Sequence, residues 1–338
     1  MKMNERAKES EPLLSIIVVT WNGKSYALEC IESLNAQLTR LSAEVIVVDN
    51  GSIDGTPEAI RLQFPNVTLI ENHANLGFAR ANNIGMALSR GKYVCLVNSD
   101  VVVPPGSLEK MIEFMEAHPE IGVLGPKMLS PDGGIGASVM RFPTVWNTLC
   151  CALGLHLIFP RSTLFGGFSM DGYAYDAIEN VEVLTGWFWM IPRIALQMVG
   201  ELDEQFFMYG EDIDWSYRFR AAGWQVVFYS DAGALHYGAA SSEEAPARFY
   251  VEMRRANLQY FRKHHGWLRV FGYRLAIWIH EIVRVVGYSF VYCFKRHRRP
   301  EAAFKIRRST ACMRWLLGDN SLLTMPAKIG EPATRGAL

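Results

Sequence analysis

Short runs of β-branched residues alternate with helical patterns over the first 125 residues, and this alternation restricts the fold more than any other feature. Each run is almost wholly apolar, as expected for strands that are covered on both faces. Strands separated by helices build parallel sheets, because a crossover must bring the chain back to the starting edge. Four strands are predicted, at residues 15–20, 44–49, 67–71 and 93–97. The predicted fold class is therefore α/β, with a mostly parallel sheet flanked by helices.

The pattern weakens from Ser130 to about Val181, where glycine, proline and aromatic residues are frequent and no element is predicted. One interpretation is a loop region that covers a substrate. Regular structure is predicted to resume with strands at 183–191 and 225–229, a short helix after Pro192 and a helix near 213–222. The composition then shifts to basic and aromatic helix, which predicts a domain boundary near Glu243.

Charge is balanced over the whole chain, with 34 basic and 34 acidic residues, but it is not balanced along the chain. Residues 245–310 contain 15 Lys or Arg and 3 Asp or Glu, which is a local net charge of +12. We predict an α/β domain at residues 13–242 and a C-terminal, basic, amphipathic helical extension at 243–318. The remaining residues, 1–12 and 319–338, are predicted to be flexible tails.

A long apolar stretch from Leu275 to Phe294 raises the question of a membrane-spanning helix. Charged residues near its centre argue against spanning. On a helix, one polar stripe would contain Arg274, Glu281, Arg284, Tyr288 and Lys295. The helix could therefore lie in a membrane interface, or it could pack its apolar face on the protein's own core. The cluster of Lys295, Arg296, Arg298 and Arg299 favours the membrane, because anionic headgroups attract such clusters.

The six cysteines include no CxxC pair, and several lie inside apolar runs, which predicts reduced and buried thiols. The first twelve residues are polar and lack the apolar segment of a secretory signal. Both features predict a cytosolic location.

Polar residues follow three of the predicted strands, at the edge where open parallel sheets bind ligands. The three clusters are Thr20–Gly23, Asp49–Ser52 and Asn98–Asp100. Asn, Asp, Gly and Ser also form ordinary turns, so each cluster alone has a structural explanation. Three clusters at one edge favour a ligand site, in which the Asp49 carboxylate would accept hydrogen bonds from a base or a ribose hydroxyl.

The run Asn98, Ser99 and Asp100 is similar to the short acidic motif that holds a divalent cation in nucleotide-sugar enzymes. Its hard oxygen ligands suit Mn²⁺ or Mg²⁺, with diphosphate oxygens and water completing the coordination. One carboxylate is a poor metal site by itself, so another side chain is needed. His236 is a candidate, because neutral imidazole binds metals, although a lone histidine more often has a structural role.

Three acids, Glu211, Asp212 and Asp214, follow an aromatic run at a predicted junction between a loop and a helix. Acids at a helix N-terminus are ordinary partners of the helix dipole, which explains one or two of them. A carboxylate bordered by aromatic groups is also partly desolvated, and its pKa rises toward that of a general base for a sugar hydroxyl.

Taken together, these motifs resemble the family 2 glycosyltransferases with the GT-A fold, particularly the rhamnosyltransferase-like branch. The resemblance covers about residues 14–265, and the motifs occur in the family's order. The matching stretches are Ser15–Gly23 (SIIVVTWNG), Val47–Thr56 (VVDNGSIDGT), Asn75–Asn83 (NLGFARANN), Leu96–Asp100 (LVNSD), Phe206–Asp214 (FFMYGEDID), Arg220–Gly223, and His236 with Gly238.

The resemblance implies a donor site. Thr20, Trp21 and the adjacent Asn22 would line the nucleotide pocket, in which Asp49 would bind the base or ribose and Arg80 would face the base or diphosphate. Asp100 would coordinate the cation, with Asn98 nearby, and His236 would be a further metal or phosphate ligand. The implied cofactor is Mn²⁺ or Mg²⁺. The implied donor is dTDP-rhamnose or a UDP-sugar.

The resemblance also implies an acceptor site, with Asp212 as the catalytic base, Glu211 positioning the acceptor, and Gly186 and Trp187 facing it. A single base allows direct displacement with inversion of the anomeric configuration, without a covalent sugar intermediate. The implied acceptor is a lipid-linked or polysaccharide glycan in cell-envelope assembly. We expect the enzyme at the inner face of the cell membrane, peripherally bound.

The sequence also bears on three other functions. A catalytically silent nucleotide-sugar-binding or membrane-bound scaffold of the same fold would be indicated by loss of Asp212 or Asp100, and both are present. A dinucleotide-dependent oxidoreductase needs a GxGxxG loop after the first strand, which Trp21–Lys24 does not provide. Nucleic-acid binding by the basic segment is not expected, because apolar helix beside the charge suits lipid better.

Overall fold

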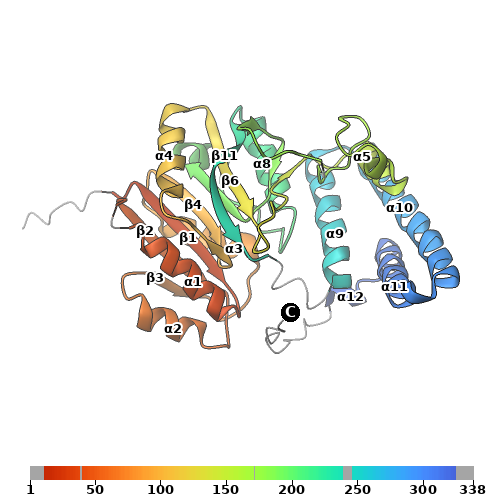
Figure 1. Ribbon diagram of the computed structural model, residues 1–338, viewed down its shortest axis with the longest axis horizontal. Helices are drawn as coiled ribbons and strands as arrows, with labels where there is room; N and C mark the ends of the chain where they lie inside the picture. The colour runs from red at the N-terminus through yellow and green to blue at the C-terminus, as the bar shows by residue number, and fades with distance from the viewer. Residues whose placement is uncertain (1–10, 39, 171, 239–245, 325–338) are drawn as a thin grey trace, which may run out of the picture. The chain divides into compact units, whose positions relative to one another are not determined.

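A computed structural model describes residues 11–38, 40–170, 172–238 and 246–324 (Figure 1). Its contacts divide the chain into two compact units. The first unit comprises Met1–Ser138, Tyr175–Phe207 and Trp215–Tyr237, and the second comprises Val139–Ala174, Met208–Asp214 and Gly238–Leu338. The boundary predicted near Glu243 and most of both predicted tails lie outside the described residues.

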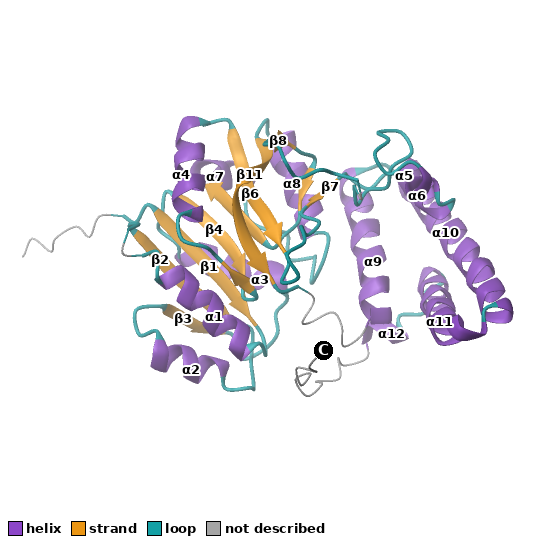
Figure 2. Ribbon diagram, viewed as in Figure 1, coloured by secondary structure: helices purple, strands orange, loops and turns teal. Residues whose placement is uncertain are grey.

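One large sheet forms the centre of the first unit (Figure 2). Its strands are β1 (Leu14–Thr20), β2 (Ala43–Asp49), β3 (Thr68–Glu71), β4 (Tyr93–Asn98), β5 (Val101–Val102), β6 (Ile121–Leu129), β8 (Glu179–Asn180), β10 (Phe188–Pro192) and β11 (Gln225–His236). The order is β3-β2-β1-β4-β10-β6-β11-β5, and β8 pairs with β11. Strands β3, β2, β1 and β4 run parallel, as do β6 and β11, whereas β10, β5 and β8 are antiparallel to their neighbours. The predicted mostly parallel α/β sheet is confirmed.

Helices cover both faces of this sheet. They are α1 (Lys24–Asn35), α2 (Thr56–Gln63), α3 (Phe78–Leu88), α4 (Ser107–Ala117), α7 (Arg193–Val199) and most of α8 (Glu211–Ala221). Ile16 and Val18 of β1 share a buried cluster with Cys30 of α1. Ile17 points to the opposite face, since side chains alternate along a strand, and it meets Gly85 of α3. A Cβ at Gly85 would lie 2.5 Å from Ile17 Cγ2, so only glycine lets α3 approach the sheet this closely.

The later strands differ from the prediction. The apolar stretch 183–191 forms two separate strands, β9 (Val183–Leu184) and β10, because a turn with a hydrogen bond from the Trp187 amide to the Thr185 carbonyl interrupts it. The strand predicted at 225–229 continues to His236, because an irregularity between Tyr229 and Gly233 resets its register against β6. This irregularity breaks the apolar pattern that the sequence prediction followed.

The second unit is mainly helical. Its elements are β7 (Val139–Met140), α5 (Val145–Ala152), α6 (Leu155–Ile158), α9 (Pro246–His264), α10 (Trp267–Phe294), a 3₁₀ turn (Arg296–Arg298), α11 (Arg299–Leu316) and α12 (Ser321–Thr324). Helix α10 packs against α5, α9 and α11. Phe261 of α9 stacks on Tyr273 of α10 with ring centroids 4.2 Å apart. The segment 130–181, for which no element was predicted, thus contributes two short helices.

The orientation of α10 corrects the expectation for its polar stripe. The helix begins at Trp267 rather than Leu275, and Glu281 is fully buried against α9, where its Oε1 lies 3.8 Å from Arg254 Nε. Burial, together with Arg254 and Arg284, lowers the pKa of the neighbouring His280 to about 2, so this ring is neutral. His280 and Glu281 therefore face inward, whereas Lys295 at the end of the stripe is exposed. Most large apolar side chains of α10 are exposed, so the interpretation in which the apolar face packs on the protein's own core is wrong for most of that face.

Candidate active site

Strand β2 ends in Asp49, whose carboxylate is held by the turn that follows. Its Oδ2 accepts hydrogen bonds from the amides of Gly51 (3.0 Å) and Ser52 (2.9 Å). Gly51 has φ +83°, and a Cβ there would lie 2.7 Å from the Ala74 amide nitrogen, so the turn requires glycine. The other oxygen of Asp49, Oδ1, is buried without a partner among the described residues.

Thr20 lies beside Asp49, because the two residues are paired in the register of β1 and β2. Its hydroxyl is also buried and has no partner in the part of the chain that the structure describes. Nearly all buried polar atoms in proteins are hydrogen-bonded. Two unsatisfied oxygens on paired residues at the ligand-binding edge of the sheet therefore indicate a place for a polar ligand or ordered water.

Asn22 joins the loops after β1 and β2 instead of leaving its polar groups open. Its side-chain Oδ1 accepts a hydrogen bond from the backbone amide of Ile53 at 2.8 Å, and its own backbone amide donates to Ser52 Oγ at 2.9 Å. Its backbone has φ +49°, a conformation that Asn tolerates well. The adjacent Trp21 is half-buried. Asn22 thus fixes the walls of the candidate pocket.

A residue that the sequence prediction missed, Asn50, connects this turn to the start of α3. Its Oδ1 accepts from Asn72 Nδ2 and from the Leu76 amide, each at 3.1 Å, and its Nδ2 donates to the Gly77 carbonyl at 3.3 Å.

The predicted site residue Arg80 follows on α3, with its Nε 3.8 Å from Glu204 Oε2. Both side chains are exposed, and exposed ion pairs contribute little to stability, so the Arg80 guanidinium remains available to a ligand.

Asp100 and His236 meet at the same edge. Strand β5 pairs with β11 so that His236 lies opposite Val101, the neighbour of Asp100, and His236 Nε2 is 3.1 Å from Asp100 Oδ1. The imidazole stacks on Trp187, with ring centroids 5.4 Å apart. The Trp187 carbonyl accepts from the amide of Asn98. Four residues are thus brought together, from β4, the turn between β4 and β5, the end of β11 and the turn before β10.

The chemistry of this pair fits a divalent cation. Two ligands at about 2.1 Å from an octahedral ion lie about 3 Å apart along an edge, close to the observed separation. No group of three or more His, Cys, Asp or Glu side chains suited to a metal occurs within the described residues. A cation held by Asp100 and His236 would therefore need further oxygens from a ligand and water, which an open substrate-binding site provides.

Helix α1 adds contacts near His236 that the sequence did not reveal. Tyr237 Oη donates to Glu29 Oε1 at 2.8 Å, and its ring packs on Tyr26 with centroids 5.0 Å apart. Burial and the charge of Asp100 raise the pKa of the Cys30 thiol, so this cysteine stays protonated. A regular helix with two polar residues three positions apart gives no local signal of such a role.

The acids at the start of α8 lie in the second unit and have different environments. Glu211 is buried, its Oε2 has no partner among the described residues, and burial together with the charge of Asp212 raises its pKa well above the usual value. Asp212 is partly exposed. Asp214 is fully buried, and its Oδ1 lies 2.8 Å from Lys263 Nζ and 2.6 Å from His264 Nε2 of α9. Of the three, Asp212 is the carboxylate that a solute can reach.

Comparison with known proteins identifies the family. The sequence profile described as Glycosyl transferase family 2 matches residues 15–172. The N-acetylglucosaminyl-diphospho-decaprenol L-rhamnosyltransferase of Mycobacterium tuberculosis is 30% identical over 277 residues, which cover 76% of this chain and 87% of that protein. The chain belongs to glycosyltransferase family 2.

Solved structures show that this family 2 glycosyltransferase has the GT-A fold. The mannosyltransferase PcManGT from Pyrobaculum calidifontis, solved with GDP-Man and Mn²⁺, aligns with a TM-score of 0.56 at 17% identity and covers 90% of this chain and 88% of its own. GalNAc-T7, solved with UDP, GalNAc and Mn²⁺, aligns with a TM-score of 0.51 at 14% identity, over 69% of this chain and 44% of its own. Asp49 ends β2 and Asp100 follows β4, at the carboxyl ends of parallel strands, where open α/β sheets bind their ligands.

Proposed function

We propose that this glycosyltransferase is an inverting hexosyltransferase that uses a nucleoside-diphosphate sugar, either dTDP-rhamnose or a UDP-sugar. The acceptor is a lipid-linked or polysaccharide glycan in cell-envelope assembly, as the name of the mycobacterial relative suggests. One observation carries the donor site: Thr20 and Asp49 each have a buried oxygen without a partner among the described residues, at the sheet edge that also holds the Asp100–His236 pair. Asp49 would accept from the base or ribose, and Arg80 would face the base or diphosphate.

Asp100 and His236 would hold Mn²⁺ or Mg²⁺, with Asn98 nearby. The bound cation would supply positive charge to the departing nucleoside diphosphate. Both solved neighbours were determined with Mn²⁺, which supports this choice of metal. Trp187 would keep the imidazole of His236 in place by stacking, and it would border the acceptor together with Gly186.

Asp212 would act as the general base, taking the proton of the acceptor hydroxyl as its oxygen attacks the anomeric carbon. Glu211 would position the acceptor, and its raised pKa would let it donate a hydrogen bond to a sugar oxygen. Attack and departure occur on opposite faces in one step, which inverts the anomeric configuration.

We also propose that the enzyme works at the inner face of the cytoplasmic membrane, bound peripherally. A lipid-linked acceptor is confined to that surface. The basic second unit, with its exposed apolar helix, supports this location.

The donor site is tested by thermal shift with dTDP, UDP, GDP and NAD, each with Mn²⁺ and again with a chelator. We expect dTDP or UDP to stabilise the protein with Mn²⁺ only, by about 2.7 kcal/mol at a hundredfold excess over Kd. Asp100→Asn should abolish this shift, whereas Asp132→Asn, on an exposed loop, should retain it. A response to NAD alone, or to no nucleotide, would contradict the proposal.

A further inference from the structure

Helix α10 presents an apolar face to its surroundings over its whole length. Ten of its large apolar side chains are exposed: Trp267, Leu268, Phe271, Leu275, Ile282, Val283, Val286, Phe290, Tyr292 and Phe294. We call this set the α10 outer face. The 28-residue helix is long and apolar enough to cross a membrane by length and composition. Exposed apolar surfaces of this extent are rare in soluble monomers and mark interaction sites.

The distribution of polar groups on α10 is the reverse of that on an ordinary surface helix. Between Arg269 and Lys295, none of the exposed residues is charged. Its polar groups are bonded on the inner side instead: His280 Nε2 is 3.1 Å from Arg254 of α9, and Arg284 donates to the same nitrogen from one turn further along α10 at 2.5 Å. Polar side chains that turn inward while apolar ones face outward are typical of helices in contact with lipid.

The apolar surface continues from α10 onto its neighbours α5 and α6. Helix α5 packs on α10, with Val145 next to Gly272. The exposed apolar residues of this segment are Trp146, Leu153, Leu157, Ile158 and Phe159. Of the 26 large apolar residues that are exposed in the described chain, 18 lie in the second unit. The exposed apolar side chains are therefore concentrated on this unit.

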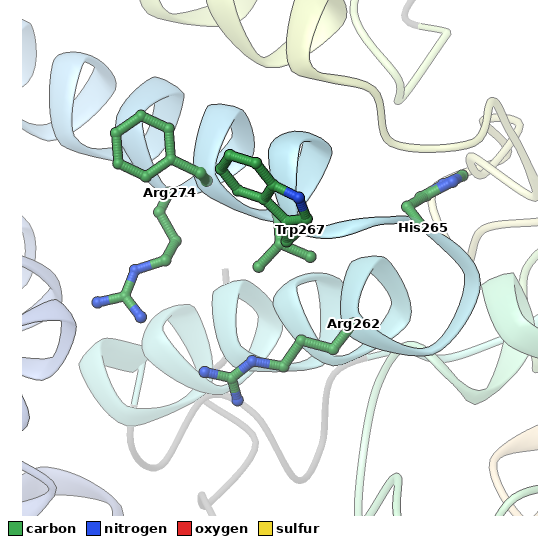
Figure 3. A pocket seen from close by; sticks show the side chains of 6 residues that line it. Arg262, His265, Trp267 and Arg274 are labelled. Carbon is green, nitrogen blue, oxygen red and sulfur yellow. The ribbon is translucent and has the colours of Figure 1, made fainter.

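A pocket at the N-terminal end of the α10 outer face supplies cationic groups. In Figure 3 the side chains of Arg262, from α9, and Arg274, from α10, extend to the same side of Trp267. Arg274 donates to the Leu316 carbonyl, and neither guanidinium has an acidic partner within the described residues. Arginine binds phosphate oxygens well, and the tryptophan ring suits the boundary between headgroups and acyl chains.

The charged residues at the C-terminal end of α10 and along α11 decide how α10 would be oriented in a bilayer. Lys295 and Arg296 follow the helix directly, and α11 carries Arg307 and Arg314 exposed along its length while it packs against α10. If α10 crossed the bilayer, α11 would have to enter the hydrocarbon with these charges, which is costly. A helix lying in the interface, with basic groups at both ends, satisfies both constraints.

We propose that the α10 outer face inserts into the interface of an anionic phospholipid bilayer, parallel to its plane, with Arg262 and Arg274 binding a lipid phosphate. This deepens the membrane location proposed above by naming the surface and the lipid chemistry. The basic groups at both ends match anionic headgroups, and the apolar residues between them match the acyl boundary.

Vesicle flotation without nucleotide or acceptor tests the proposal independently of the donor site. The wild type should float with phosphatidylcholine vesicles containing phosphatidylglycerol and remain unbound with phosphatidylcholine alone. Val286→Glu with Phe290→Glu should lower the partition coefficient at least about tenfold. The matched control, Leu62→Glu with Met198→Glu, changes two exposed residues of the first unit and should float as the wild type does.

Arg262→Gln should weaken binding to anionic vesicles about fivefold, and millimolar inorganic phosphate should not release the wild type. Insertion is measured with an NBD dye on Val286→Cys in a Cys293→Ser background, since Cys293 is exposed. We expect a blue shift with anionic vesicles and quenching by spin labels at a shallow acyl position. A wild type that stays unbound, glutamate variants that float normally, or a dye that remains in water would overturn the proposal.

Discussion

At the start of α8, three acids within four positions have three different environments. Glu211 is buried, and its Oε2 has no hydrogen-bond partner in the described part of the chain, whereas Asp212 is partly exposed and Asp214 is buried in an ion pair. Because burial decides which carboxylate can meet a substrate and which cannot, the proposed roles differ although the residue types are nearly the same.

Asp212→Asn is expected to lower kcat by about 10²- to 10⁴-fold, because the amide cannot take the acceptor proton. The thermal shift produced by the nucleotide and Mn²⁺ should remain, since Asp212 does not hold the donor. Glu201→Gln, an exposed change outside α8, is the control and should retain full activity. Normal turnover of Asp212→Asn would remove this residue from the role of base.

Glu211→Gln is expected to raise the thermal midpoint at pH 8. Burial, followed by the charge of Asp212, raises the pKa of Glu211 in the folded protein. Its contribution to stability is therefore complete below the pKa of the unfolded chain, and it is lost as pH rises through the folded value. The advantage of Gln should shrink as pH falls toward 5, measured by thermal unfolding across pH. A lower midpoint than wild type at pH 8 would show that the carboxylate has a cationic partner.

At the scale of elements, the buried ion pair of Asp214 with Lys263 and His264 connects the first turn of α8 to the end of α9. Asp214→Asn is expected to lower the free energy of unfolding by about 3 kcal/mol, because Lys263 loses a buried counter-charge and His264 loses its carboxylate partner. Urea denaturation measures this loss. Glu252→Gln removes the pair with Arg255 on the surface of α9 and should change stability by less than about 1 kcal/mol. Equal effects of the two variants would refute a structural role for Asp214.

At the scale of the whole molecule, the chain combines a GT-A sheet unit with a basic helical unit that exposes apolar residues. Val286→Glu with Phe290→Glu should leave nucleotide-dependent thermal shifts unchanged. The same variant should transfer sugar to a lipid-linked acceptor in anionic vesicles about tenfold more slowly, because the enzyme is no longer concentrated at the surface. With a short water-soluble acceptor its rate should equal that of the wild type. Equal rates on both acceptors would separate the helix from catalysis at membranes.

The prediction that six buried cysteines lie in this chain is wrong at two positions. Cys293 is exposed and Cys151 is partly exposed, while the other four are buried. Cys293 lies near the end of α10, in the apolar run 275–294, for which the sequence left both a membrane interface and the protein's own core open. Apolar neighbours in the sequence therefore did not imply burial of Cys293, because the side of α10 that carries it is exposed.

The sequence by itself determined the fold class, the four parallel strands and the polar residues at their ends. Buried parallel strands need continuous apolar runs, and the turns that end them need Asn, Asp, Gly and Ser, so both leave a local pattern. Thr20, Asp49 and Asp100 could be chosen for this reason.

Only the tertiary structure decided the rest. Asp100 and His236 meet because β11 continues past an irregularity to pair with β5, and no local pattern contains that pairing. The inward turn of Glu281 depends on Arg254 of another helix, and the burial of Asp214 depends on Lys263. Periodicity tells which side of an element is polar, but which side is buried depends on the partner that packs against it, and that partner is distant in the sequence.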